Sequence, residues 1–342
     1  MSLQKAYRKR QIKRLSVALF LGVSIVILLW LSVISGSNGV RIEETFQLFT
    51  CNDQLGMIVQ AIRLPRALAA LLVGMLLGLS GVVMQGVLRN PLASPFTLGI
   101  SQAAGFGASL AIIVFETTLL DGWFSFLSIP LFAFLSSMLC SLLIIWLGKK
   151  VGMSPTVLIL AGVGLGSLFH SGTMFLQYFT TEINAAATLF WTFGDLSKAT
   201  YPILWILSAV FFISLVVLWS SHWKFDALGF GDESAFNKGV NVKTFRVSML
   251  LFSSLCTALA VAFFGIIGFI GLVAPHMVRL VLGSAHSALI PLSALSGGVL
   301  LLGADWAARM MLYPTILPVG ILTSFIGAPM LLYLLVSGKK IK

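Results

Sequence analysis

The sequence predicts an all-α polytopic membrane protein, and three observations lead to that fold class. The chain of 342 residues is 58% hydrophobic and only 10% charged, whereas soluble domains carry about 25% charged residues. Charge-free runs long enough to cross a bilayer as helices recur along the chain. Basic residues gather between alternate runs, which is the usual charge bias of membrane proteins. The net charge of +11 is therefore sorted by loop and does not indicate a nucleic-acid-binding protein.

Ten transmembrane helices with both termini in the cytoplasm account best for the charge pattern. The charge-free runs cover residues 15–40, 67–88, 90–115, 122–148, 151–181, 199–223, 247–278, 280–304 and 310–338. Nine crossings would leave the basic C-terminal tail outside, against the positive-inside rule, so one run holds two helices. Splitting 247–278 near Gly265, Gly268 and Gly271 keeps 17 of the 22 lysines and arginines inside.

This count gives the expected organisation of the chain. We expect a basic cytoplasmic N-terminus (1–14), a single ten-helix transmembrane domain (15–338) that includes a cytoplasmic loop (222–246), and a cytoplasmic tail (339–342). The three cysteines are far apart, so they are expected to be packing residues rather than a disulfide framework or metal cluster.

The segment from residue 63 to 95 is expected to be a packed helix with two polar ends. Its glycines Gly74, Gly78 and Gly81 indicate close packing against other helices. Arg63 and Arg66 share one face at its outer end, because helical residues three apart are neighbours. They are either interfacial anchors or a docking surface for an acidic partner.

The loop at residues 222–246 is the longest cytoplasmic segment. Acidic residues open a helical pattern from Asp232 to Lys238, Gly239 stops it, and a second helix begins near Asn241. The loop is either an ordinary solvated connection or a rigid helical elbow that inserts into a soluble partner.

The residues indicate no enzyme, cofactor or metal site. The sequence has no phosphate-binding loop, and the glycines from Gly162 to Gly166 lie in an apolar run, so they indicate helix packing rather than a dinucleotide site. No lysine, arginine or carboxylate lies at mid-membrane, where ion-coupled transporters usually keep them. His170 is the only candidate relay and is expected to be a hydrogen-bonded packing residue. Arg309 is expected to pair with Asp305, four residues earlier.

Four motifs resemble those of the FecCD-type permeases, the membrane subunits of ABC importers for iron–siderophores, haem and vitamin B12. They are the segment 63–95, GDESAFNKGVNV (231–242), GFIGLVAPHMVRL (268–280) and LPVGILTSFIGAPMLLYLL (317–335). The resemblance implies a dimeric permease in the bacterial inner membrane with two cytoplasmic ATPase subunits and an extracytoplasmic binding protein. ATP hydrolysis would then occur on the partners.

The resemblance also implies roles for individual residues. Docking to the binding protein falls to Arg63, Arg66 and Arg309. Coupling to the ATPases falls to Gly231, Asp232, Glu233, Ser234, Ala235, Gly239 and Val240. Asn90, Leu92, Ser154 and Thr156 match family positions at the cytoplasmic gate and path, and we add Gln85 to this group.

Several positions depart from the family pattern. Ile316 replaces a frequent acidic residue, Ala285-His286-Ser287 replaces an Asp-His-Arg, and Lys238 replaces a leucine. These changes favour one half of a heterodimer over a homodimer. The expected cargo is a ferric siderophore, with vitamin B12 or haem as alternatives. An ion-coupled secondary transporter and a non-transporting receptor or scaffold are the other candidates.

Overall fold

The computed structural model describes residues 3–35, 54–115, 123–312 and 315–337, and every regular element within these ranges is helical. Residues 1–2 of the expected N-terminal segment and the expected tail 339–342 lie outside the described residues. The elements are α1 (Leu3–Ile34), α2 (Gln54–Ile58), η3 (Val59–Arg63), α3 (Leu64–Leu88), α4 (Ile100–Ser109), η4 (Leu110–Val114), α5 (Trp123–Val151), α6 (Pro155–Tyr178), α7 (Glu182–Thr192), η6 (Leu196–Lys198), α8 (Tyr201–Ser220), α9 (His222–Gly229), α10 (Asp232–Asn237), α11 (Val242–Phe264), α12 (Ile270–Leu282), α13 (His286–Met310) and α14 (Val319–Ser337).

The all-helical membrane fold is confirmed. Among the described residues, seven helices are long and apolar enough to span a membrane, and three shorter apolar helices cover Ile100–Val114, Ile270–Leu282 and Val319–Met330. The expected break in the run 247–278 is also found, because α11 ends at Phe264 and α12 begins at Ile270. The count of ten crossings stays a prediction, since three of these helices are short.

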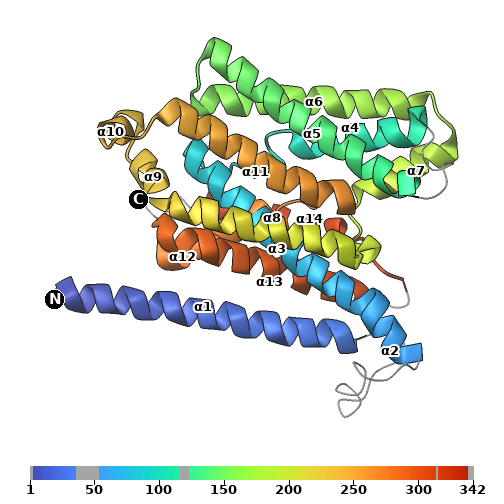
Figure 1. The fold of residues 1–342 in the computed structure, drawn as a ribbon, viewed down its shortest axis with the longest axis horizontal. Helices are drawn as coiled ribbons and strands as arrows, with labels where there is room; N and C mark the ends of the chain where they lie inside the picture. Colours follow the sequence, from blue (N-terminus) through green and yellow to red (C-terminus); the bar gives the residue numbers. More distant parts are fainter. Residues whose placement is uncertain (1–2, 36–53, 116–122, 313–314, 338–342) are drawn as a thin grey trace.

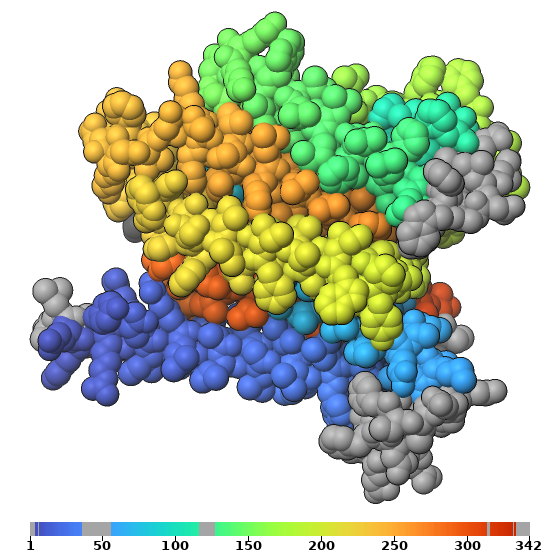
Figure 2. Space-filling view, in the orientation of Figure 1, coloured from blue at the N-terminus to red at the C-terminus, as the bar shows by residue number. Residues whose placement is uncertain are grey.

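Helix α3 forms the centre of the molecule and α1 lies at its edge. In the most apolar window of each helix, 83% of the α2–α3 segment is buried but only 17% of α1. Figure 1 shows α1 running beside α12 and α13, and Figure 2 shows most of its surface uncovered. The glycines of α3 explain its central place, because they bring its backbone against two neighbouring helices.

These contacts are made backbone to backbone. A Cβ atom at Gly74 would meet the carbonyl of Gly297, and one at Gly78 would meet that of Ser293, both on α13. A Cβ at Gly81 would meet the backbone of Gly271 on α12. Small residues let membrane helices approach this closely. The packing role expected for the glycines of this segment is therefore confirmed.

Replacing Gly81 with alanine is expected to destabilise the protein. The new methyl group would overlap the Gly271 carbonyl, and forced overpacking of this kind costs about 1–3 kcal/mol. Gly22→Ala on α1 is the matched control, because nothing lies within 4 Å of a Cβ there. Thermal unfolding of the purified protein should show a lower Tm for Gly81→Ala only. Equal Tm values for the two variants would contradict this packing.

The polar segments lie at two opposite ends of the molecule. The beginning of α1 lies at the same end as α9 and α10, and α2 and α7 lie at the opposite end (Figure 1). We call these the α10 end and the α7 end. The basic N-terminal segment and the loop at 222–246 thus share one end, as the positive-inside assignment requires.

Candidate functional site

A cavity of about 880 Å³ opens between α4, α6, α7 and the segment that joins α11 to α12, and the beginning of α14 completes its wall. The described residues that line it include no lysine, arginine, aspartate or glutamate. The polar side chains on its wall are those of Thr97, Gln102, Ser167, His170, Thr173, Gln177, Thr192 and Ser324. The cavity therefore offers neutral hydrogen-bonding groups on a largely apolar surface, which is typical of sites that hold an organic solute.

Glycine contacts between α6 and the beginning of α4 form one wall of this cavity. A Cβ at Gly166 would lie 2.9 Å from the Cα of Gly99, and one at Gly162 would lie 2.8 Å from the Cα of Leu98. Gly99 itself has a φ of 76°, which a residue with a side chain rarely adopts. The interpretation of Gly162 and Gly166 as helix-packing residues is confirmed.

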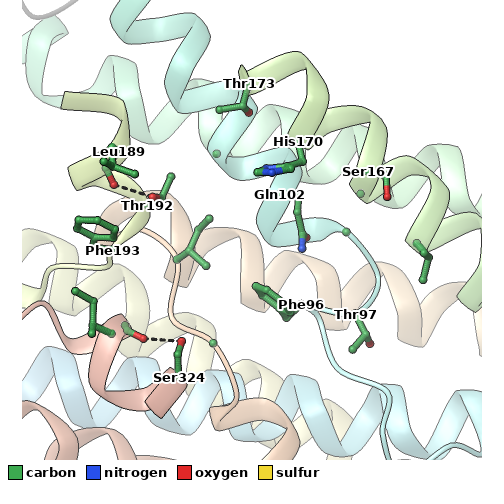
Figure 3. A pocket seen from close by; sticks show the side chains of 18 of the residues that line it. Phe96, Thr97, Gln102, Ser167, His170, Thr173, Leu189, Thr192, Phe193 and Ser324 are labelled. Carbon is green, nitrogen blue, oxygen red and sulfur yellow. Dashed lines mark hydrogen bonds between the residues drawn. The ribbon is translucent and has the colours of Figure 1, made fainter. Parts of the chain in front are cut away.

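Gln102 and His170 lie next to each other on the cavity wall, across from Thr192, Phe193 and Ser324 (Figure 3). The Oε1 atom of Gln102 is buried and has no hydrogen-bond partner among the described residues. His170 is exposed on the wall rather than packed between helices. The expectation that His170 is a packing residue was wrong, because the face of α6 that carries it borders open space.

The loop at 222–246 is helical at the α10 end, which agrees with the elbow alternative, while its insertion into a partner stays a prediction. Gly231, with a φ of 114°, precedes α10, and Gly239, with a φ of 81°, follows it. Ala235 is buried and its carbonyl accepts a hydrogen bond from Val240 N at 3.0 Å, which folds the chain back towards α11. The helix ends at Asn237 instead of Lys238. We use the name elbow for residues 222–241, which also contain α9, a helix that the sequence did not predict.

Arg246 connects the elbow to the ends of other helices. Its guanidinium donates to both carboxylate oxygens of Asp232 at 3.0 and 3.1 Å. It also donates to the carbonyl of Met153 at 2.7 Å and to that of Val87 at 3.3 Å. The residue is only 2% exposed. One side chain thus joins α10 and α11 to the end of α3 and to the turn between α5 and α6.

Four of the expected gate residues lie in the turn after α3 and at the beginning of α6. The Oδ1 atom of Asn90 accepts a hydrogen bond from Leu92 N at 2.9 Å, which fixes the turn after α3. The Oγ of Ser154 caps α6 by accepting from Val157 N at 3.3 Å, and Thr156 is exposed in the first turn of that helix. Ser154 also lines a second cavity of about 740 Å³. The gate role of these residues stays a prediction.

Gln85 lies between helices rather than on the large cavity. It is 2% exposed, and its Nε2 donates to the carbonyl of Leu272 on α12 at 3.2 Å. It is not among the residues that line the large cavity. The observed contact of Gln85 is therefore one between α3 and α12.

A second pair links α9 to α13 at the same end. The Oδ1 of Asp226 accepts from the backbone N of His286 at 2.9 Å and lies 2.7 Å from its Nδ1. Burial alone would raise the pKa of Asp226, but the hydrogen bonds and charge interaction with His286 outweigh it, so the pKa is lowered. The contact therefore stabilises the fold at pH values above the usual 3.8 and is lost as the pH falls through the lowered value.

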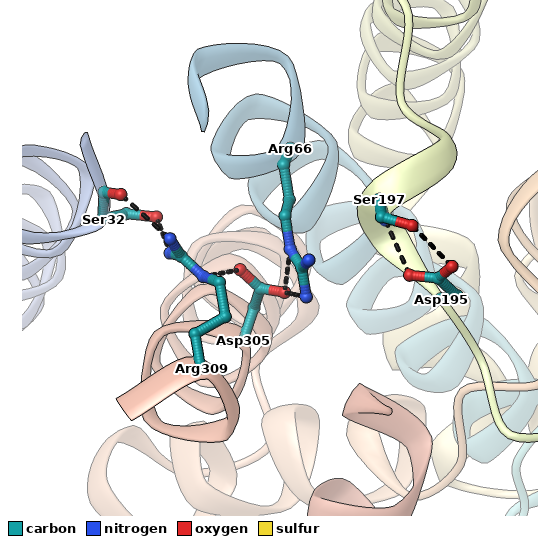
Figure 4. Close-up of polar contacts among 6 residues, drawn as sticks. All are labelled: Ser32, Arg66, Asp195, Ser197, Asp305 and Arg309. Atoms are coloured by element: carbon teal, nitrogen blue, oxygen red, sulfur yellow. Dashed lines mark hydrogen bonds and ion pairs between the residues drawn. The ribbon is translucent and has the colours of Figure 1, made fainter. Parts of the chain in front are cut away.

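At the α7 end, Asp305 holds two arginines (Figure 4). Its Oδ1 lies 2.9 Å from Nε and from Nη2 of Arg66, and its Oδ2 lies 3.1 Å from Nε of Arg309. Arg309 also donates to the backbone carbonyl and the hydroxyl of Ser32 on α1. The side chain of Asp305 is 0% exposed. The expected pairing of Arg309 with Asp305 is confirmed.

Arg63 completes this group, which we call the Asp305 cluster (Arg63, Arg66, Asp305 and Arg309). Arg63 donates to the carbonyl of Val33 at 3.0 Å, and it is buried, like Arg66. Arg66 and Arg309 thus share the carboxylate of Asp305, whereas Arg63 is bonded to the end of α1, and these bonds are to the chain's own groups. The docking role expected for the arginines stays a prediction.

Sequence reasoning missed the roles of Arg246 and Asp226, and it missed the contact of Asp305 with Arg66. The usable signal for Arg246 is a basic residue at the start of an apolar run and close to an acidic helix start. No signal in the sequence linked Asp226 to His286, which lies 60 residues away.

Comparisons with known proteins agree on one family. Residues 24–337 match the model of the FecCD transport family. A protein of Methanocaldococcus jannaschii named as an ABC transporter permease is 48% identical over 83% of this chain and 82% of its own length. The hemin transport system permease protein HmuU of Yersinia pestis is 35% identical over 94% of this chain and 96% of its own length.

A solved structure agrees with these matches. It is described as an inward-facing conformation of a metal-chelate type ABC transporter, and it superposes with a TM-score of 0.81 at 30% identity, covering 94% of this chain and 99% of the other. A match over nearly the whole chain in both sequence and structure settles the family. The protein belongs to the FecCD transport family of membrane permeases.

Proposed function

We propose that this chain is the permease subunit of an ATP-driven importer that carries an iron–siderophore complex across the cytoplasmic membrane. The large cavity is the observation that carries this proposal. Its polar wall consists of neutral side chains and one imidazole, whereas a bare iron or calcium ion would need carboxylate ligands or several imidazoles. An already chelated metal needs only hydrogen bonds and apolar contact.

The surface beside the cavity supports the proposal that a second permease subunit is a partner. Large apolar side chains stand exposed beside it on α6, α7 and α14, among them Tyr178 at 82%, Ile183 at 81% and Phe325 at 74%. A second subunit placed here would cover these side chains and enclose the path between the two chains. The sequence departures around the elbow and the α12–α13 loop favour a heterodimer.

The elbow is the proposed site of contact with an ATPase subunit. Phe236 and Lys238 project from it and are exposed, and the second cavity lies directly beside them, lined by Asp232, Glu233 and Arg246. Since Arg246 ties α10 to α3 and to the turn before α6, a push on the elbow would reach both sides of the proposed gate.

The Asp305 cluster is the proposed docking site for an extracytoplasmic binding protein. The cluster holds three arginines and one carboxylate, which pairs with Arg66 and Arg309, so it keeps an excess of positive charge that would attract an acidic partner. Reversing both Arg63 and Arg66 to glutamate should weaken docking. Because Arg66 is bonded to buried Asp305, Arg63→Gln is the cleaner test of the same role.

Haem is a second candidate cargo, favoured by His170 on the cavity wall. Imidazole is a common axial ligand of haem iron, and the relative from Yersinia pestis is named as a hemin permease. Vitamin B12 is a third candidate, because other relatives are named as vitamin B12 permeases.

The cargo can be tested with the complex purified from membranes together with its accompanying subunits, which mass spectrometry would identify. We expect ferric siderophore presented by the binding protein to stimulate ATP hydrolysis, and hemin and cobalamin to give no stimulation. A His170→Gln variant should keep the siderophore response, since a chelated metal needs no protein ligand. Stimulation by hemin that His170→Gln abolishes would assign the importer to haem instead.

A further inference from the structure

A third cavity, of about 410 Å³, lies at the α10 end between the beginning of α1 and the loop that joins α12 to α13. Three cationic side chains form one wall, those of Arg10, Lys13 and Arg14 on α1. Residues 281–285 form the other wall. Among the described residues, no carboxylate lines this cavity, so its character is strongly basic.

The three cations have no partner in the described part of the chain. Neither an ion pair nor a hydrogen bond joins the side chain of Arg10, Lys13 or Arg14 to another described residue. Buried Arg66 and Arg246, in contrast, each hold a carboxylate of this protein. The carboxylate of Asp226, beside the α12–α13 loop, is already bonded to His286. The basic cavity therefore has the charge to hold an anion from outside the chain.

The place of the cavity along α1 indicates the kind of anion. The helix is polar up to Arg14 and free of charge from Leu15 onward, so the three cations lie where the apolar span begins. That boundary corresponds to the headgroup region of a bilayer. Leu15, Leu19 and Val23, four residues apart on one face of the helix, are 63%, 60% and 57% exposed. These three residues lie on the side of α1 that faces away from the cavity, and their exposed apolar side chains mark the start of the lipid-facing span directly after Arg14.

We propose that this cavity is a binding site for the phosphate headgroup of an anionic phospholipid. The guanidinium and ammonium groups of α1 bind the phosphate oxygens, since charge-assisted hydrogen bonds to phosphate are strong. Basic pockets between membrane helices on the cytoplasmic side suit such headgroups.

The lipid would fasten a part of α1 that the protein itself holds weakly. Among the described residues, the hydrogen bonds between α1 and other elements lie at its far end, at Ser32, Val33, Ile34 and Ser35. The beginning of α1 has none to other elements, and it precedes residue 24, where the family match starts. A bound headgroup would bridge α1 to the loop just before His286.

The experiment compares two triple variants of the full-length protein purified in neutral detergent. Arg10→Gln/Lys13→Gln/Arg14→Gln removes the cations of the cavity. Lys5→Gln/Arg8→Gln/Lys9→Gln removes the same charge from the same helix outside the cavity. Binding of phosphatidylglycerol, measured by native mass spectrometry over a concentration series, should weaken at least about tenfold in the first variant and less than about twofold in the second. Phosphatidylcholine should not bind at this site in either protein.

The other outcomes are equally clear. Equal weakening in both variants would overturn the proposal in favour of diffuse attraction to basic residues. Unchanged binding in the cavity variant would also overturn it. Inorganic phosphate that competes with phosphatidylglycerol at millimolar concentration would assign the site to a soluble phosphate compound instead of a lipid. Size-exclusion profiles identical to the parent protein would show that both variants fold, as expected for solvent-exposed side chains on a peripheral helix.

Discussion

Replacing Asp305 with alanine should lower the stability of the protein more than any other single change considered for the α7 end. The carboxylate is fully buried and holds both Arg66 and Arg309. Without it, two buried guanidinium groups would repel each other with no counter-charge. Loss of one partner from a buried ion pair costs about 3–5 kcal/mol. The purified variant should therefore show a strongly reduced Tm and poor recovery from membranes.

Asp195→Ala is the matched control for this prediction. Asp195 also carries a carboxylate near the α7 end, and among the described residues the hydrogen bonds of this carboxylate are to Ser197 in a local turn (Figure 4). Loss of a local cap of this kind costs about 1 kcal/mol. A Tm for Asp305→Ala as high as that for Asp195→Ala would show that the Asp305 cluster does not hold α3, α13 and α1 together.

Replacing Arg246 should interrupt the proposed transmission from the elbow to the gate. Arg246→Lys keeps the charge but cannot reproduce the two-pronged contact with Asp232 and the bonds to two carbonyls. We expect ATP-driven uptake by the complex to fall at least about tenfold. Each hydrogen bond of the guanidinium that lysine cannot replace contributes about 1.5–3 kcal/mol. Arg246→Ala should lose stability as well.

Lys243→Ala separates this effect from a general loss of positive charge. Lys243 lies one turn earlier on α11 and is exposed. Its removal should leave uptake within about twofold of the parent complex, as is usual for exposed charges. A double-mutant cycle with Asp232→Asn gives the coupling energy directly. Additive losses for Arg246→Lys and Asp232→Asn would contradict the role of the pair.

The sequence predicted the fold better than it predicted the environment of its charged residues. The bilayer determines the length of the apolar runs and the distribution of basic residues between the loops. The helices and the break between α11 and α12 could therefore be predicted from the sequence. Gly231 and Gly239 marked the elbow because positive φ angles favour glycine. Each of these features is local in sequence.

The arrangement of the buried charges was not local and could not be read in the same way. Arg66 and Asp305 are 239 residues apart, and Arg246 and Val87 are 159 apart. Their contacts depend on which helices become neighbours. The environment of His170 could not be predicted for the same reason, because the residues that face it in the cavity come from α4, α7 and α14. The glycines in the sequence indicated that helices pack closely at these positions. Which helices are the partners was known only from the structure.

Uptake into proteoliposomes tests the central claim most directly. The complex of this permease with its accompanying subunits would be reconstituted with ATP inside or outside the vesicles, and labelled ferric siderophore would be supplied with its binding protein. We predict uptake that requires ATP on the ATPase side and is insensitive to an uncoupler. Uptake by the permease without ATPase subunits, abolished by the uncoupler, would show an ion-coupled transporter. No uptake of ferric siderophore, hemin or cobalamin by the intact complex would contradict import of metal chelates altogether.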